Sequence, residues 1–142
     1  MSAFSETRRA EVRARAGSRC EYCHLPTLGQ VATFPIDHVI PLDGGGTNEV
    51  GNLALACPHC NAHKWTAFEG TDLESGAIVR FFHPRSDVWS DHFEWSVARP
   101  GELVGKTPTG RATIAGLRVN DTDMIELRVL LAELGVFPVS GG

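Results

Sequence analysis

The motifs CEYC at residues 20–23, DHVIPLDGGG at residues 37–46 and CPHCNAHK at residues 57–64 decide the fold. Two Cys-x-x-Cys pairs bracket an Asp-His pair, and the second pair runs directly into an Asn/His/Lys cluster. Two thiolates on one tight turn point at the same ion, and two such turns complete a tetrahedral zinc site. We therefore expect a structural Zn²⁺ on four ligands: Cys20, Cys23, Cys57 and Cys60.

The same spacing also occurs in redox proteins, and the cysteines could simply be unliganded. A redox role predicts a thioredoxin-like βαβ context, which this chain does not show. Cys-x-x-Cys is too tight for an ordinary structural disulfide, and in a reducing compartment four cysteines are more typical of metal ligands. Zinc is the preferred interpretation.

Length and composition predict one compact domain. The chain has 142 residues and is 42% hydrophobic, enough for one core and too little for two. We expect residues 1–70 to form the core with an N-terminal helix, and residues 71–142 to form an extension that packs on it. No apolar run approaches the roughly 20 residues of a membrane span, and the N-terminus lacks the apolar segment of a secretory signal. A cytoplasmic protein without membrane contact is expected.

The charge distribution is uneven. A net charge of -4 argues against a protein that coats nucleic acid without specificity. Residues 1–64 carry six basic and six acidic groups, so the excess of acidic groups lies in residues 65–142. Five arginines within residues 8–19 could follow a phosphate backbone, and Arg15 and Arg19 are candidate nucleic-acid contacts. A solvated helix face explains the same run equally well.

The N-terminal half predicts helix, strand, loop, strand and helix. Ser5 is a good N-cap and Gly17 a good stop for a helix over residues 5–16. Residues 31–40 and 52–56 predict two strands joined by a long Gly-rich loop. A helix over residues 57–68 completes a ββα unit, and the fold class is α+β.

The second half is less regular. Residues 78–82 predict a strand, and residues 89–97 belong to a second hairpin-like layer. Residues 109–117 and 121–134 predict two helices. The second helix has four apolar residues on one face: Met124, Leu127, Leu131 and Leu134.

The order of these motifs resembles the HNH endonuclease superfamily in its zinc-stabilised four-cysteine form, as found in bacterial stand-alone members. The resemblance covers residues 20–64, under a third of the chain. It implies a ββα-metal core, also called a His-Me finger, and a nuclease activity that depends on a divalent metal. The positions that carry it are Cys20-x-x-Cys23, Asp37-His38-x-x-Pro41, Gly44-Gly45, Asn52-Leu53 and Cys57-x-x-Cys60-Asn61-x-x-Lys64.

The resemblance assigns the catalytic base and the catalytic metal. His38 would activate water, a role that imidazole performs near neutral pH. Asp37 would ligate the metal, and Asn61 would offer its amide oxygen to the same ion. Asn61 stands where many members have a histidine, and oxygen ligands favour Mg²⁺ or Mn²⁺. His63 is a further candidate for this metal, with a solvent-facing position as the alternative.

Two more residues complete the expected site, and a neighbouring tryptophan lies outside it. Asn52 matches the middle Asn of the family, whose side chain ties across the loop and holds the base. Lys64 lies one turn beyond Asn61 and could bind a phosphate oxygen of the nucleic acid. Trp65 is expected in the core rather than as a stacking platform for a base.

These residues predict a hydrolase that cuts phosphodiester bonds of DNA, by nicking or by double-strand cleavage. RNA stays open as a substrate, and the sequence does not set the oligomeric state. The alternative is a zinc-stabilised nucleic-acid-binding module without catalysis. Against it stands the joint presence of five residues: Asp37, His38, Asn52, Asn61 and Lys64.

Overall fold

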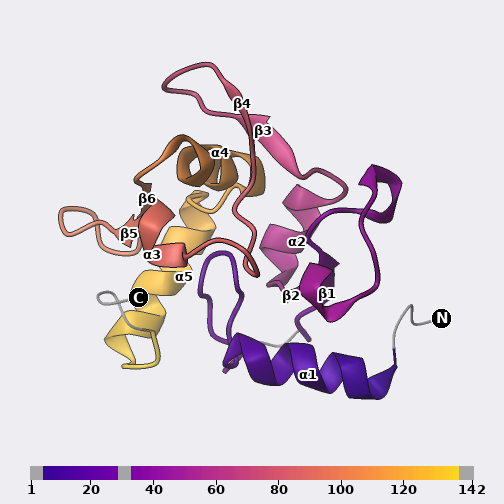
Figure 1. Cartoon of the computed structure of the whole chain (residues 1–142). Helices are drawn as coiled ribbons and strands as arrows, with labels where there is room; N and C mark the ends of the chain where they lie inside the picture. The colour runs from indigo at the N-terminus through magenta and orange to yellow at the C-terminus, as the bar shows by residue number, and fades with distance from the viewer. Residues whose placement is uncertain (1–4, 29–32, 138–142) are drawn as a thin grey trace.

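The computed structural model describes residues 5–28 and 33–137. Within these residues it mixes helices with short antiparallel strands that pair as three two-stranded sheets, in agreement with the expected α+β class (Figure 1). The elements are α1 (Glu6–Ala16), β1 (Ile36–His38), η1 (Leu42–Gly44), η2 (Val50–Asn52), β2 (Leu53–Leu55), α2 (Pro58–Lys64), β3 (Glu69–Thr71), β4 (Ile78–Arg80), α3 (Trp89–His92), β5 (Phe93–Trp95), β6 (Leu103–Gly105), α4 (Pro108–Leu117) and α5 (Thr122–Glu133).

Helix α1 begins and ends where the sequence predicts. The Ser5 hydroxyl accepts a hydrogen bond from the Arg8 amide at 3.2 Å, as an N-cap should. Gly17 ends the helix in the left-handed region, with φ 69°. Val12 and Ala16 are buried on the inner face. α1 packs on β2 and lies along the lower edge of the molecule in Figure 1.

Strands β1 and β2 form the expected hairpin, although both are shorter than predicted. They pair antiparallel, with Asp37 opposite Ala54 and His38 opposite Leu53. Pro35 precedes β1 and has no N–H to add to a ladder, so regular pairing begins after it. Asn52 belongs to η2 rather than to β2. Residues 31 and 32 of the predicted strand lie outside the described residues.

Helix α2 starts at the second cysteine pair and ends four residues earlier than predicted. Cys57 is its N-cap, with Sγ accepting from the Cys60 amide at 3.4 Å, and Pro58 occupies the first turn. The helix stops because Trp65 adopts φ 45° and ψ -112°, outside the helical region. β2 and α2 thus place the cysteines directly beside the hairpin.

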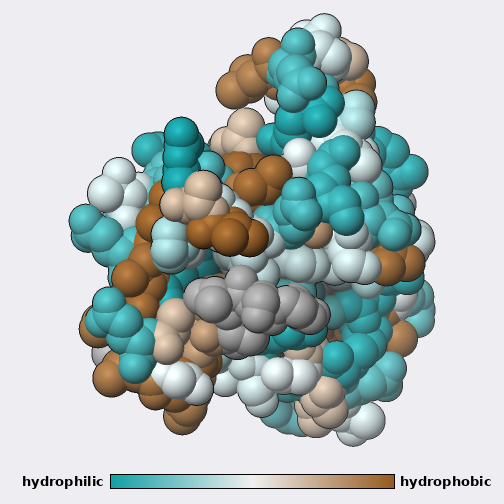
Figure 2. Space-filling model, turned by 90° about the vertical axis from the view of Figure 1, so that its left-hand side faces the viewer, coloured by the Kyte–Doolittle hydropathy of each residue, from teal (hydrophilic) through white to brown (hydrophobic). Residues whose placement is uncertain are grey.

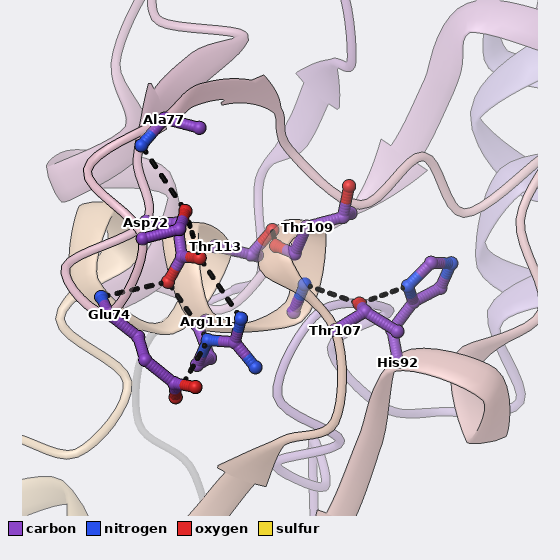
Figure 3. A network of polar contacts seen from close by, with 10 residues as sticks. Asp72, Glu74, Ala77, His92, Thr107, Thr109, Arg111 and Thr113 are labelled. Atoms are coloured by element: carbon purple, nitrogen blue, oxygen red, sulfur yellow. Dashed lines mark hydrogen bonds and ion pairs between the residues drawn. The ribbon is translucent and has the colours of Figure 1, made fainter.

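The β3–β4 hairpin is fastened to α4 by a buried carboxylate. Asp72 accepts from Arg111 Nε at 2.9 Å and Nη2 at 3.0 Å, and from the Ser75 hydroxyl at 2.7 Å (Figure 3). The hydrogen bonds from Arg111 hold the pKa of Asp72 well below its usual range. The hairpin extends from this anchor at the top of Figures 1 and 2, and it exposes Leu73 and Ile78.

Residues 89–97 contribute to the predicted hairpin-like layer, with a short helix before the strand. They form the short helix α3 followed by β5, which pairs with β6. Trp89 begins α3 and lies against Phe93 and Trp95, with ring centroids 5.2 and 5.8 Å away. An aromatic cluster thus packs beside this hairpin.

Helix α5 has a charged residue in the middle of its buried face. Met124 and Leu131 are buried as expected, whereas Leu134 is exposed. Arg128 is fully buried and donates to the carbonyl oxygens of Gly101 at 2.8 Å and Val119 at 2.9 Å. Buried carbonyl oxygens need a hydrogen-bond donor, and Arg128 provides it. The apolar periodicity of α5 does not predict this requirement, because the carbonyls belong to other segments.

We expect Arg128→Met to lower the free energy of unfolding by about 3 kcal/mol, because buried carbonyls would lose a charged donor. Urea denaturation measures the loss. Arg99→Met is the matched control, since the Arg99 side chain is 77% exposed. Equal stability of the two variants would contradict the structural role of Arg128.

The first cysteine turn makes several contacts with the second half of the chain, in addition to the packing of α2 on α4. Trp89 Nε1 donates to the Tyr22 carbonyl at 2.9 Å, and Arg85 forms an ion pair with Glu21. The buried His24 ring stacks on Trp89 with centroids 3.9 Å apart, and burial lowers the pKa of His24 to about 4.

Among the described helices, none combines the length and the apolar character required for membrane crossing.

Candidate functional site

The four cysteines lie together in the interior. Their Sγ atoms are all within 4.8 Å of one another, and each residue is fully buried with a free thiol. Sγ of Cys23 and Sγ of Cys57 are 3.8 Å apart. Tetrahedral coordination with Zn–S bonds of about 2.3 Å requires sulfur atoms about 3.8 Å apart. The cluster therefore has the size of a zinc site and could bind this metal.

The environment of the thiols also suits a cation. The Cys23 amide donates to Cys20 Sγ at 3.5 Å, which holds the first turn as the Cys60 amide holds the second. Hydrogen bonds from neighbouring thiols raise the pKa of Cys23 and of Cys60 and lower the pKa of Cys57. Four thiolates at this distance repel one another, so a bound cation is needed to keep all of them charged.

A pocket of about 380 Å³ lies between the end of β1 and the helix α2. Its wall includes Asp37 and His38 from β1, Asn61 from α2 and Trp65 just after it. β1 pairs with β2, and the second cysteine turn follows β2 directly, so the hairpin and the helix meet here. Three of the sequence-predicted site residues thus line one cavity.

His38 is the last residue of β1 and is half-buried. Its Nε2 lies 2.7 Å from Oδ1 of Asn48, which belongs to the Gly-rich loop. An amide oxygen only accepts, so Nε2 carries the proton and the lone pair of the neutral ring is on Nδ1. Asn48 was not identified from the sequence, because its position after three glycines and a threonine resembles that of any loop asparagine.

Asn52 ties the two ends of this loop together. Its Oδ1 accepts from the Ile40 amide at 2.9 Å, and its Nδ2 donates to the carbonyls of Ile40 at 2.8 Å and Thr47 at 2.9 Å. Gly46 leaves room for these bonds, because a Cβ at this position would lie 1.7 Å from the Ile40 oxygen. These are the cross-loop bonds expected of Asn52, and they support the segment that carries Asn48.

We expect Asn52→Ala to lower the free energy of unfolding by about 2 kcal/mol, because three part-buried hydrogen bonds to the backbone of Ile40 and Thr47 are lost together. Chemical denaturation measures this. Asn61→Ala removes the same amide from a half-buried helical position and serves as the matched control. If Asn52→Ala and Asn61→Ala lower the free energy of unfolding by the same small amount, the loop does not depend on Asn52.

Asp37 is buried in a polar cluster. Its Oδ2 accepts from the Tyr22 hydroxyl at 2.7 Å and from Lys64 Nζ at 3.1 Å, while Oδ1 has one longer contact to Nζ at 3.4 Å. Burial raises the pKa of Asp37, and the charge of Lys64 opposes this. Burial and the Asp37 charge raise the pKa of Tyr22 well above its usual value. Tyr22 was not identified from the sequence, where it is only an aromatic between two cysteines.

Lys64 lies inside the protein rather than at a phosphate-binding surface. The ammonium group is 0% exposed, pairs with Asp37 and donates to the His38 carbonyl at 3.0 Å. A buried ammonium needs such partners, and the carboxylate provides the charge. The expected contact of Lys64 with nucleic acid is not available in this conformation. Lys64 instead positions Asp37 and the end of β1.

The oxygen atoms in the pocket fit a hard divalent ion. Among residues 5–28 and 33–137, the one polar contact of Asp37 Oδ1 is the long one to Lys64, so it is the carboxylate oxygen with capacity for another cation. Asn61 lines the same pocket and carries an amide oxygen. Mg²⁺ commonly takes one or two protein oxygens and completes its shell with water and substrate phosphate. Asp37 and Asn61 therefore match the ligand set that Mg²⁺ or Mn²⁺ uses.

His63 is exposed and takes the solvent-facing alternative, whereas Trp65 lies elsewhere than expected. The His63 ring lies 4.4 Å from that of His59, and both group with Asp121, away from the pocket residues. Residues 59 and 63 are one turn apart on α2, so they share a helix face that Asn61 does not. Trp65 is 79% exposed at the pocket, and its expected core position is wrong. The left-handed φ that ends α2 turns this side chain outward.

The two candidate arginines line a separate cavity. Arg15 and Arg19 belong to a pocket of about 160 Å³ that shares no lining residue with the His38 pocket. Arg15 donates to the carbonyls of Val50 at 2.9 Å and Leu53 at 2.5 Å, and thereby joins α1 to the hairpin. Part of the basic run is thus structural, and a contact of these arginines with nucleic acid stays a prediction.

Comparison with protein-family models matched residues 20–66 to the HNH endonuclease family. The match covers both cysteine pairs, the loop and every residue of the His38 pocket. No curated protein and no solved structure matches the chain. The family match indicates a function on nucleic acids.

Proposed function

Because residues 20–66 belong to the HNH endonuclease family, we propose that this protein is a metal-dependent endonuclease that hydrolyses phosphodiester bonds of DNA. The observation that carries the proposal is the convergence of Asp37, His38 and Asn61 on one pocket within the matched segment. This pocket combines a base with two oxygen ligands for a metal, as hydrolysis of a phosphodiester requires.

His38 acts as the general base. Its Nδ1 takes a proton from the attacking water, while the hydrogen bond from Nε2 to Asn48 keeps the ring in one orientation and stabilises the imidazolium that forms. Asn52 holds the loop that carries Asn48, and so it positions the base without contact with the substrate.

Asp37 and Asn61 would hold the Mg²⁺ or Mn²⁺. When bound, the ion stabilises charge on the phosphate oxygens and on the leaving oxygen. Lys64 and Tyr22 keep the Asp37 carboxylate in place and offset the cost of its burial. The same contacts orient Oδ1 as the oxygen with capacity for the ion.

Trp65 supports a nucleic acid as the substrate. Its indole is exposed at the same pocket as His38, where a large apolar side chain has no packing role. Stacking of a base on an exposed aromatic stabilises nucleic-acid binding by about 1–3 kcal/mol per base. A base beside the scissile phosphate would thus rest on Trp65.

A binding module without catalysis is the second candidate. It is favoured by the Lys64 ammonium, which already neutralises the carboxylate expected to hold the metal, with Nζ 3.1 Å from Oδ2. In that case the protein would bind nucleic acid through the same surface and leave it intact.

A panel of nucleic acids separates the two candidates. Supercoiled plasmid, linear duplex, single-stranded DNA and RNA are incubated with Mg²⁺, with Mn²⁺ and without added divalent ion. We expect relaxed or linear plasmid only when the ion is present. Omission of the ion is the proper control, since a chelator would also remove structural zinc. A band shift without cleavage under every condition would favour the binding module.

A further inference from the structure

A second cluster of metal-binding side chains lies on the opposite side of α2 from Asn61. His59 and His63 are one turn apart, and the ligand atoms of both lie within 4.8 Å of a carboxylate oxygen of Asp121, the N-cap residue of α5. His59 Nε2 and Asp121 Oδ2 are 3.7 Å apart. Three side chains from two distant segments thus converge on one point.

We propose that His59, His63 and Asp121 bind a second divalent transition metal, most naturally Zn²⁺. Two imidazoles and one carboxylate form the ligand set that zinc accepts, whereas Mg²⁺ prefers oxygen ligands alone. Histidines four residues apart on one helix face offer two nitrogens to the same ion. Water would complete the coordination, as it does in other sites with three protein ligands.

The distances fit an ion after small side-chain adjustments. Zinc bonds of about 2.0–2.2 Å place tetrahedral ligand atoms about 3.4 Å apart. The separation of 3.7 Å between His59 Nε2 and Asp121 Oδ2 is close to this value. All ligand atoms of the three residues lie within 4.8 Å of one another. His63 is exposed and can turn toward the ion without disturbing the core. The cluster therefore closes by rotation of surface side chains.

The turn between α4 and α5 holds the ligands and competes with the ion. His59 Nε2 donates to the Arg118 carbonyl oxygen at 2.8 Å, so this nitrogen must give up its proton and that hydrogen bond to bind the metal. The Arg118 side chain lies 3.0 Å from Asp121 Oδ2 and 59% of it is exposed, so its ion pair is weak and a divalent ion can displace it. Arg118 is thus a competing cation at the site.

Binding would link the two parts of the chain. His59 lies between Cys57 and Cys60 on α2, while Asp121 begins the last helix of the extension. A metal on these residues would hold the helix that carries Asn61 against residues far along the sequence. The site shares no ligand with the cysteine cluster or with the His38 pocket.

The test is the zinc content of the whole protein. Purified chains are equilibrated with Zn²⁺, freed of excess metal by gel filtration, and analysed for zinc and protein. We expect two zinc ions per chain for the wild type and one for His63→Ala and for Asp121→Asn. Asp123→Asn, an exposed acid on the same helix, is the matched control and should retain two.

Titration calorimetry with Zn²⁺ on protein that already holds one zinc gives a second measure. Asp121→Asn should weaken binding at least 10-fold, and Arg118→Gln should strengthen it, because the competing cation is gone. One zinc per chain in the wild type, or two in the His63→Ala variant, would overturn the proposal. Circular dichroism checks that each variant is folded, and no step requires nuclease activity.

Discussion

Cys57→Ser should leave the chain unfolded and without zinc. Cys57 is a zinc ligand by prediction, caps α2 through its sulfur, and is fully buried between β2 and α2. Structural zinc sites contribute about 10–16 kcal/mol to small domains, which exceeds or equals the whole stability of a typical domain. Loss of one ligand therefore removes more free energy than the remaining core can replace.

Circular dichroism and zinc analysis of purified Cys57→Ser measure this effect. Ala56→Ser is the matched control, because Ala56 is also fully buried beside the cluster and the change adds the same hydroxyl without removing a ligand. Chelation of zinc from the wild type should reproduce the loss of structure. A soluble, folded and zinc-free Cys57→Ser protein would show that the cluster does not stabilise the fold.

His38→Ala should lower the rate of DNA cleavage about 10²- to 10⁴-fold while the protein stays folded and zinc-bound. This range is the usual contribution of a positioned general base. His38 lies at the end of β1, and its ring is half-buried at the pocket, so truncation opens space without breaking the hairpin ladder. The effect should fall on the chemical step rather than on DNA affinity.

Plasmid nicking under single-turnover conditions measures the rate, and a band-shift assay measures affinity. His83→Ala is the matched control, since His83 is a half-buried histidine outside the His38 pocket. Added imidazole should restore part of the rate to His38→Ala by supplying the missing base. Equal cleavage by wild type and His38→Ala would remove His38 as the base, and the binding module would become the better hypothesis.

Local features of the sequence predicted the elements that depend on nearby residues. Helix α1 follows from Ser5 and Gly17, whose capping and left-handed geometries act within one turn. The cysteine cluster follows from two short spacings, each of which determines one turn. The cross-loop bonds of Asn52 were expected from the family resemblance, and the structure contains them.

The misplaced residues depend on contacts between distant segments. Lys64 was expected to bind a phosphate because it lies one turn beyond Asn61 on the same helix face. Its ammonium instead pairs inside the protein with Asp37, which is 27 positions away. Trp65 was assigned to the core by its size alone, and the backbone turn at the end of α2 exposes it. Arg128 interrupts an apolar face because two carbonyls from other segments require a donor there.

The sequence by itself determined the positions of the candidate metal ligands and of the candidate base, because spacing within a turn and chemical type are local properties. Only the tertiary structure decided how those residues are grouped. Helix periodicity already places His63 and Asn61 on different faces of α2, but only the packing of the second half of the chain brings Asp121 beside His63. The physical reason is that a helix turns about 100° per residue, so the partner of each side chain is set by whatever packs against its face.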